Sequence, residues 1–151
     1  MITYTQERWR EFVKDAEPIF ALHWREIALD QERIPMGMNG AAYQDIDDKG
    51  MLHIVAVRDE GKLIGYHMGM IVTHPHYKDA GLMATTDLFY ILPEYRNRGG
   101  IGARMILAVE GFLRERKVVK AFIGTKLHQS HAKLLKAMGW TPTDLVFSKL
   151  L

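Results

Sequence analysis

Apolar residues recur at intervals of three and four positions from Trp9 to Ile27. This spacing places them along one side of a helix and is typical of an amphipathic helix that packs on a core. Pro18 lies inside the pattern, lacks an amide donor and suits the first turn of a helix, so we expect two helices that meet at this residue. Residues 30–50 mix Pro, Gly, Asn and Asp without a period, and this composition predicts a long loop.

The pattern changes to that of β-strands after Met51. Residues 52–73 are rich in β-branched and aromatic side chains and are interrupted by turn-forming residues around Gly61, which predicts a β-hairpin. Residues 82–92 repeat the strand composition and end at Pro93, which cannot donate a hydrogen bond to a neighbouring strand. We therefore expect three consecutive strands.

The last third of the chain alternates helical and strand patterns. Residues 101–115 carry one apolar and one charged face, which predicts a helix of about four turns. Residues 118–125 predict a fourth strand, and residues 130–140 predict a helix that Gly139 closes. Residues 144–151 predict a final strand. This order of elements indicates an α/β fold.

Composition limits the classes of protein that fit these patterns. The chain has 151 residues, 48% of them hydrophobic, which suits one globular domain over residues 1–151. A net charge of +2 is too small for the basic stripe of a dedicated nucleic-acid binder. The absence of cysteine excludes disulfides, thiolate zinc sites and a cysteine nucleophile. No apolar run reaches the length of a membrane span and no leader pattern follows Met1, so we expect a cytoplasmic protein that does not enter a membrane.

The segment "ILPEYRNRGGIGARMI", residues 91–106, places three glycines between a predicted strand and a predicted helix. A glycine turn lets the backbone approach an anion closely, and the N-terminus of a helix adds unpaired N–H groups and partial positive charge. Arg96 and Arg98 add full charges beside the turn. The segment has neither the Gly-Lys-Ser/Thr of a Walker loop nor the GxGxxG of a dinucleotide fold. It predicts either a phosphate-binding turn or a tight turn with a purely structural role.

The order of the elements, together with two motifs, resembles the GCN5-related N-acetyltransferase (GNAT) family. The segment at residues 91–106 is similar to that family's apolar-Pro-Glu-Tyr-Arg stretch, which is followed by Arg or Gln, two further residues and then Gly-x-Gly. "LLKAMGW", residues 134–140, is similar to the family's helix that ends in leucine-glycine-aromatic. The resemblance covers nearly the whole chain and is strongest from Thr85 to Trp140. The segments "LHWREIAL", "MLHIVAVRD" and "GTKLHQSH" look most like those of short phage-encoded members.

The resemblance implies a mixed, mostly antiparallel twisted sheet with helices on both faces and a V-shaped opening between the strands at 82–92 and 118–125. It also implies binding of acetyl-coenzyme A, with the diphosphate at the glycine turn, the pantetheine arm along the end of strand 82–92, and the Ile91 amide facing the thioester. The residues that it implies in coenzyme binding are Phe89, Tyr90, Ile91, Arg96, Arg98, Gly99, Gly100, Ile101, Gly102 and Ala103.

The chain departs from the family pattern at two places. There is one residue more than usual between Arg96 and Gly100, so either Asn97 takes the Arg/Gln position or the loop bulges. The tyrosine with which many members protonate the leaving thiolate would fall on Leu135. The resemblance therefore leaves the phosphate donors open by one residue and supplies no general acid at that position.

Acetyl transfer needs a neutral amine, and a positioned base contributes about 10²–10⁴-fold to such a step. Asp87 is one candidate base, and strand alternation predicts that it shares a face with Phe89 and Ile91. The alternative for Asp87 is a rim carboxylate paired with a lysine. His128 and His131 follow the fourth strand, where a histidine could serve as a base or as the missing acid, the alternative being histidines that face water.

The N-terminal helices, which in this family help to wall the acceptor pocket, carry His23 and Glu26. A carboxylate there could take part in catalysis or hold a cationic acceptor, or it could be a solvated helix residue. His23, Glu26 and Asp87 are therefore the candidates for substrate binding. The histidines of the chain have no supporting carboxylate pattern, so we expect no metal.

We therefore predict an N-acetyltransferase that moves an acetyl group from acetyl-coenzyme A to a primary amine by direct attack in a ternary complex. The acceptor would be a small-molecule or peptide amine, and a homodimer would be compatible with the family. One alternative is a catalytically silent coenzyme-binding or phage accessory protein, which Leu135 favours. Another is a nucleic-acid-associated module, suggested by "RERKVVK" at residues 114–120, although those charges would also stabilise the end of a helix.

Overall fold

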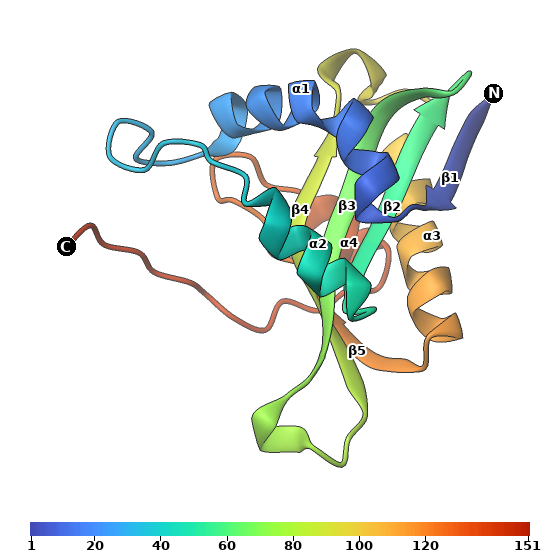
Figure 1. Ribbon diagram of the computed structural model, residues 1–151, viewed down its shortest axis with the longest axis vertical. Helices are drawn as coiled ribbons and strands as arrows, with labels where there is room; N and C mark the ends of the chain where they lie inside the picture. Colours follow the sequence, from blue (N-terminus) through green and yellow to red (C-terminus); the bar gives the residue numbers. More distant parts are fainter.

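The computed structural model describes residues 1–151 as one five-stranded sheet with helices on both faces (Figure 1). The strands lie across the sheet in the order of the chain, with antiparallel pairing from the first to the fourth and parallel pairing between the last two. They are β1 (Ile2–Gln6), β2 (Leu52–Asp59), β3 (Lys62–Thr73), β4 (Leu82–Ile91) and β5 (Val118–Phe122). The mixed, mostly antiparallel sheet that the sequence predicts is confirmed.

Two helices lie in front of the sheet in Figure 1 and two lie behind it. They are α1 (Trp9–Ile27) and α2 (Gly40–Asp48) in front, and α3 (Ile101–Glu115) and the short α4 (Ala132–Ala137) behind. The segment after α4 is tied to α3, because the indole N–H of Trp140 donates to a Glu110 carboxylate oxygen at 3.0 Å. None of these helices is both long enough and apolar enough to cross a membrane.

The larger core lies between the sheet and α1. Phe12 and Phe20 of α1 pack edge to face on Tyr66 of β3, with ring centroids 5.5 and 5.4 Å apart. Behind the sheet, Val109 of α3 belongs to a second buried cluster. Since helices cover both faces, residues 52–57 of β2 are all buried, which explains their nearly continuous apolar run in the sequence.

The helix α1 continues through Pro18, so the prediction of two helices at this point is wrong. Pro18 and Lys14, whose carbonyl loses its helical partner, both lie on the exposed side of α1, where water can bond that carbonyl. Phe12 and Phe20, on either side of the proline, stay on the buried face. Burial of one uninterrupted apolar face therefore outweighs the missing backbone bond.

Two elements form where the sequence predicts none. Residues 2–6 form β1 at the edge of the sheet, paired antiparallel with β2. The predicted loop at 30–50 contains α2, which begins after Asn39, whose side chain accepts a hydrogen bond from the Ala42 amide at 3.0 Å. Both elements are short and largely polar, so their stability comes from neighbouring elements rather than from a strong pattern of their own.

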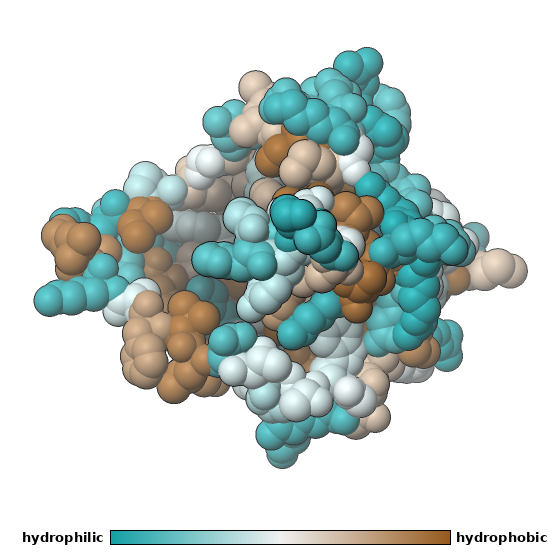
Figure 2. Space-filling model, turned by 90° about the horizontal axis from the view of Figure 1, so that it is seen from below, coloured by the Kyte–Doolittle hydropathy of each residue, from teal (hydrophilic) through white to brown (hydrophobic).

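The predicted final strand at 144–151 is not formed. The structure has no helix or strand after Ala137, and this segment runs away from the sheet to the C-terminus (Figure 1). Leu145, Val146 and Phe147 are 64%, 87% and 84% exposed, and Figure 2 shows apolar side chains gathered at that end of the molecule. The apolar pattern is real, but no strand of the sheet pairs with it.

Candidate active site

The second half of β4 has an open outer edge. β5 pairs with β4 only through Leu82–Thr85, whereas β3 pairs with it as far as Ile91. The stretch from Thr86 to Ile91 therefore has no strand on its outer side, and the sheet opens between β4 and β5 as the sequence predicts. An edge with unpaired backbone groups can accept an extended ligand in place of a strand.

The turn that follows β4 is built on left-handed residues. Asn97, Gly99 and Gly100 have φ angles of 56°, 53° and 68°. Glycine reaches this region without the steric cost of a Cβ atom, and asparagine tolerates it better than most residues. Gly102 lies inside the first turn of α3, where an added Cβ would lie 3.6 Å from a side-chain carbon of Ile91 in β4. Two glycines therefore shape the turn, whereas the position of Gly102 has room for a Cβ atom in ordinary van der Waals contact.

The N-terminus of α3 presents free backbone donors. The amides of Gly99, Gly100, Gly102 and Ala103 donate no hydrogen bond within the protein, whereas the Ile101 amide donates to a carbonyl in the turn at 3.2 Å. The first turn of α3 has no side-chain cap and no acidic residue. Four free N–H groups at the positive end of a helix dipole form a suitable site for an anion such as a phosphate.

A bonded network of polar side chains connects α1 with the end of β4. Both oxygens of the Glu26 carboxylate accept from the Arg96 guanidinium, and the Tyr90 hydroxyl donates to Glu26 at 2.8 Å. Arg96 also donates to the Ile91 carbonyl at 2.8 Å. The hydrogen bond from Arg96 is the main cause that lowers the pKa of Glu26, so this carboxylate is an ionised anchor. The structure thus turns Arg96 toward Glu26 and the end of β4, while Arg98 is exposed and has no ion pair.

His23 lies in the core beside this network. Its Nδ1 is 2.8 Å from the Tyr66 hydroxyl, and its ring stacks on Tyr90 with centroids 4.5 Å apart. Burial lowers the pKa of His23 to about 4, so the imidazole is neutral at neutral pH, and its Nε2 has no partner. The residue is 3% exposed, which suits a structural part of the site wall better than direct contact with a substrate.

The structure separates the two histidines that follow β5. The ring of His131 lies 5.3 Å from that of Phe89, at the open edge of β4, and burial lowers its pKa. His128 is exposed in the turn between β5 and α4 and makes no hydrogen bond to the other candidates. Leu135, where the family resemblance places a tyrosine, is buried. Of the two histidines, only His131 therefore lies at the open edge of β4.

A β-bulge decides where Asp87 lies. The register between β3 and β4 shifts between Met68 and Gly69, and Asp87 is the additional residue on β4. Thr86 lies on the side of His67, whose Nε2 is 2.9 Å from its hydroxyl. The bulge places Asp87 on the other side of the sheet, toward α2.

Asp87 meets a residue that the sequence prediction missed. The Tyr43 hydroxyl of α2 donates to the Asp87 carboxylate, while Phe89 packs on His131. The prediction that Asp87 shares a face with Phe89 and Ile91 is therefore wrong, because strict alternation does not hold across a bulge. Burial, followed by the hydrogen bond to Asp87, raises the pKa of Tyr43, so it remains a donor. No lysine or arginine pairs with Asp87, in contrast to the alternative of a rim ion pair.

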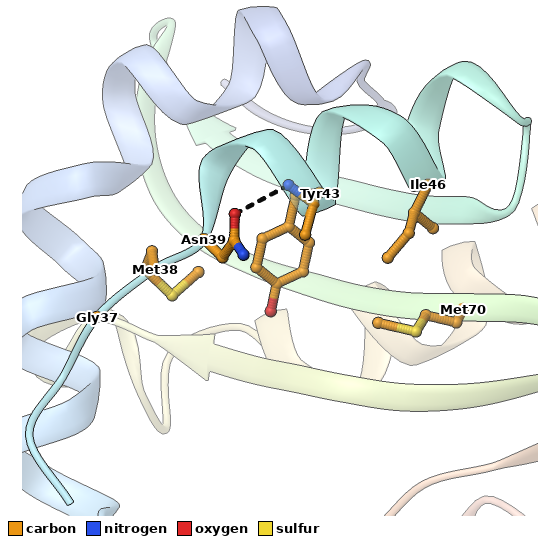
Figure 3. Close-up of a pocket in the computed structure, with 7 residues that line it drawn as sticks. Gly37, Met38, Asn39, Tyr43, Ile46 and Met70 are labelled. Atoms are coloured by element: carbon orange, nitrogen blue, oxygen red, sulfur yellow. Dashed lines mark hydrogen bonds between the residues drawn. The ribbon is translucent and has the colours of Figure 1, made fainter.

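A small cavity of about 290 Å³ lies between α2 and the sheet, beside Tyr43 (Figure 3). Tyr43 points from α2 toward the strands, and Ile46 and Met70 face each other across the space. The lining residues are Gly37, Met38, Asn39, Ala42, Tyr43, Ile46 and Met70. The cavity is therefore mainly apolar, with the Tyr43–Asp87 hydrogen bond as its nearest link to β4.

Comparison with known proteins identifies a family for almost the whole chain. A family model described as "Acetyltransferase (GNAT) family" matches residues 6–140, which include the open edge, the turn and every candidate side chain discussed above. No curated protein sequence matches the chain.

Solved structures share the fold at low sequence identity. A ribosomal-protein-alanine N-acetyltransferase from Brucella melitensis biovar Abortus 2308 is 14% identical with a TM-score of 0.72, over 100% of this chain and 99% of that chain. An aminoglycoside acetyltransferase from an uncultured soil metagenomic sample, in complex with sisomicin, is 13% identical with a TM-score of 0.72, over 99% and 96%. A predicted acetyltransferase from Clostridium acetobutylicum, solved with acetyl-coenzyme A, is 16% identical with a TM-score of 0.71, over 99% and 96%. At these identities the likeness establishes a common fold.

Proposed function

The chain belongs to the acetyltransferase (GNAT) family, and from that premise we propose that it transfers an acetyl group from acetyl-coenzyme A to a primary amine, by direct attack of the amine while both substrates are bound. The observation that carries this proposal is the set of four free amides at the start of α3, next to the open edge of β4. A diphosphate needs the first feature and an extended pantetheine arm suits the second.

The residues present fit the coenzyme. The free amides of Gly99, Gly100, Gly102 and Ala103 would hold the diphosphate, with Arg98, which has no ion pair, next to them in the chain. The strand end at 89–91 would pair with the pantetheine arm. We assign Arg96 a supporting role, because its guanidinium already bonds to Glu26 and to the end of β4.

The chemistry requires one new bond and one broken bond. The amine nitrogen forms a bond to the acetyl carbon, the carbon–sulfur bond breaks, and one proton of the attached nitrogen passes to the departing thiolate, directly or through water. Before the attack the ammonium group must lose a first proton. We propose that Asp87 takes this first proton, directly or through water, because its carboxylate lies on the α2 side of the sheet, accepts from Tyr43 and has no cationic partner. A coenzyme thiol with a pKa of about 8.5 can leave as thiolate without a strong acid, so Leu135 is compatible with turnover.

Calorimetric titration with acetyl-coenzyme A, alongside a thiol-release assay over a panel of amines, tests this function. We expect one coenzyme bound per chain and release of thiol that depends on an amine. Binding without release on any amine would favour the silent coenzyme-binding alternative, for which the buried Leu135 is the specific observation. No binding at all would contradict both.

The variant Asp87→Asn should lower kcat/KM by about 10²-fold while changing the affinity for acetyl-coenzyme A by less than about threefold. The amide oxygen can still accept from Tyr43, so the fold should persist. Asp79→Asn, a charge change at an exposed position before β4, is the matched control and should behave as the parent protein. If Asp87→Asn retains parental turnover, the assignment of the base passes to His131.

A further inference from the structure

The cavity beside Tyr43 limits what kind of acceptor can bind. Its space of about 290 Å³ suits a short alkyl chain or one aromatic ring rather than an oligosaccharide or a peptide chain. Met38 and Met70 line it from opposite segments, and the flexible thioether side chain adapts to apolar bodies of different shape (Figure 3). Apolar side chains dominate the lining, so an amine with several polar groups would leave these groups without partners.

The pairing of the nearby carboxylates limits the charge of the acceptor. No carboxylate lines the cavity itself, and three acidic side chains of α1 and α2 are already paired: Glu26 with Arg96, Asp45 with Lys49, and Asp47 with Arg8. Asp87 has the Tyr43 hydroxyl as its only hydrogen-bond partner and no cation. Asp87 is exposed at the mouth of the site, and its one carboxylate can neutralise one ammonium group. A second ammonium on the body of the ligand would lie against the apolar lining with no carboxylate to pair with it.

We propose that the acceptor is a monoamine whose amino group is carried on an apolar body, such as an alkylamine or an arylalkylamine. The ammonium group pairs with Asp87, and the body lies in the cavity under α2. This inference rests on the acetyltransferase function proposed above. It excludes polycationic aminoglycosides as good acceptors, in spite of the shared fold with an aminoglycoside acetyltransferase.

A panel of four amines tests the proposal with the 151-residue chain. The amines are 2-phenylethylamine and hexylamine as apolar monoamines, putrescine as a diamine, and sisomicin as an aminoglycoside. We expect kcat/KM to be at least about tenfold higher for the two monoamines than for putrescine or sisomicin, since a second ammonium would meet an apolar lining without a carboxylate partner. Higher kcat/KM for sisomicin or putrescine would overturn the inference and leave the acetyltransferase function intact.

Two neighbouring alanines of α2 offer a matched pair of variants. Ala42 lines the cavity and Ala41 does not, and both are exposed in the same helix. Ala42→Phe should fill the cavity and lower kcat/KM for 2-phenylethylamine at least about tenfold, whereas Ala41→Phe should stay within about twofold of the parent protein. Equal effects of the two variants would contradict binding in this cavity.

A measurement of amine binding tests the proposal even if turnover is low. Trp9 stacks on Tyr43 with ring centroids 4.7 Å apart, so a body in the cavity should change tryptophan fluorescence. We expect 2-phenylethylamine to produce a saturable change that Ala42→Phe abolishes and Ala41→Phe retains. Absence of this change would overturn the proposed acceptor class, whereas failure to bind acetyl-coenzyme A in the calorimetric titration would instead overturn the proposed function.

Discussion

Replacing Ala103 by aspartate should weaken the binding of acetyl-coenzyme A by at least about a hundredfold, which corresponds to about 2.7 kcal/mol. Ala103 is the third residue of α3, and its amide is one of the four free donors. Two unit charges 4 Å apart repel by about 4 kcal/mol at an effective dielectric constant of about 20. A carboxylate at this position therefore opposes a diphosphate strongly, even after screening by salt.

The same substitution should not weaken the fold. The first turn of α3 has no acidic residue, and an aspartate near a helix N-terminus stabilises the helix by about 0.3–1 kcal/mol. Thermal unfolding and calorimetric titration of one protein sample separate the two effects. Leu107→Asp adds the same charge at an exposed position one turn later and is the matched control. Parental affinity in Ala103→Asp would show that the diphosphate is not held at this helix start.

The free energy of unfolding should fall steeply as the pH drops below 6.5. Burial lowers the pKa to about 4 for His23 and His53 and to about 3 for His67, against 6.5 for an unperturbed imidazole. Between these values the unfolded chain binds protons that the folded protein excludes. Each histidine therefore removes about 1.4 kcal/mol of stability per pH unit, and the three together up to about 4 kcal/mol per pH unit.

Urea unfolding between pH 6.5 and 5 measures this effect, since carboxylates stay largely ionised in that range. The slope of the unfolding free energy against pH reports how many protons the chain takes up when it unfolds. His53→Gln should lower this number by about one, because the buried ring of His53 has no hydrogen-bond partner at either nitrogen and stays neutral in the folded protein. His128→Gln, the same change at an exposed residue, should leave the slope unchanged. An unfolding free energy that stays constant over this range would contradict the neutral, buried state of these histidines.

The elements with strong patterns could be predicted from the sequence. The apolar run of β2 and β3, the strand that ends at Pro93 and the amphipathic α3 each carry their own signal. β1 and α2 could not be predicted in the same way, because they are short and polar and depend on neighbours. The Asn39 cap was the one local signal for α2.

The side-chain arrangement of the site was less predictable than its backbone. The residue types at Asp87 and His131 suggested chemistry, but the bulge that turns Asp87 toward Tyr43 depends on the pairing register of two strands. The bond between Arg96 and Glu26 joins residues that lie 70 positions apart in the chain, and a single sequence contains no signal for such a pair. The cytoplasmic location and the likeness to phage-encoded members remain predictions.

The Arg96 side chain bonds at the same time to Glu26 of α1 and to the Ile91 carbonyl at the end of β4. It joins α1, whose Trp9 stacks on the cavity residue Tyr43, to the strand that leads into the glycine turn. A ligand that displaces either element alters the affinity at the other, and linkage makes this influence equal in both directions. In the proposed ternary complex, the factor by which bound coenzyme raises the affinity for the amine therefore equals the factor by which bound amine raises the affinity for the coenzyme.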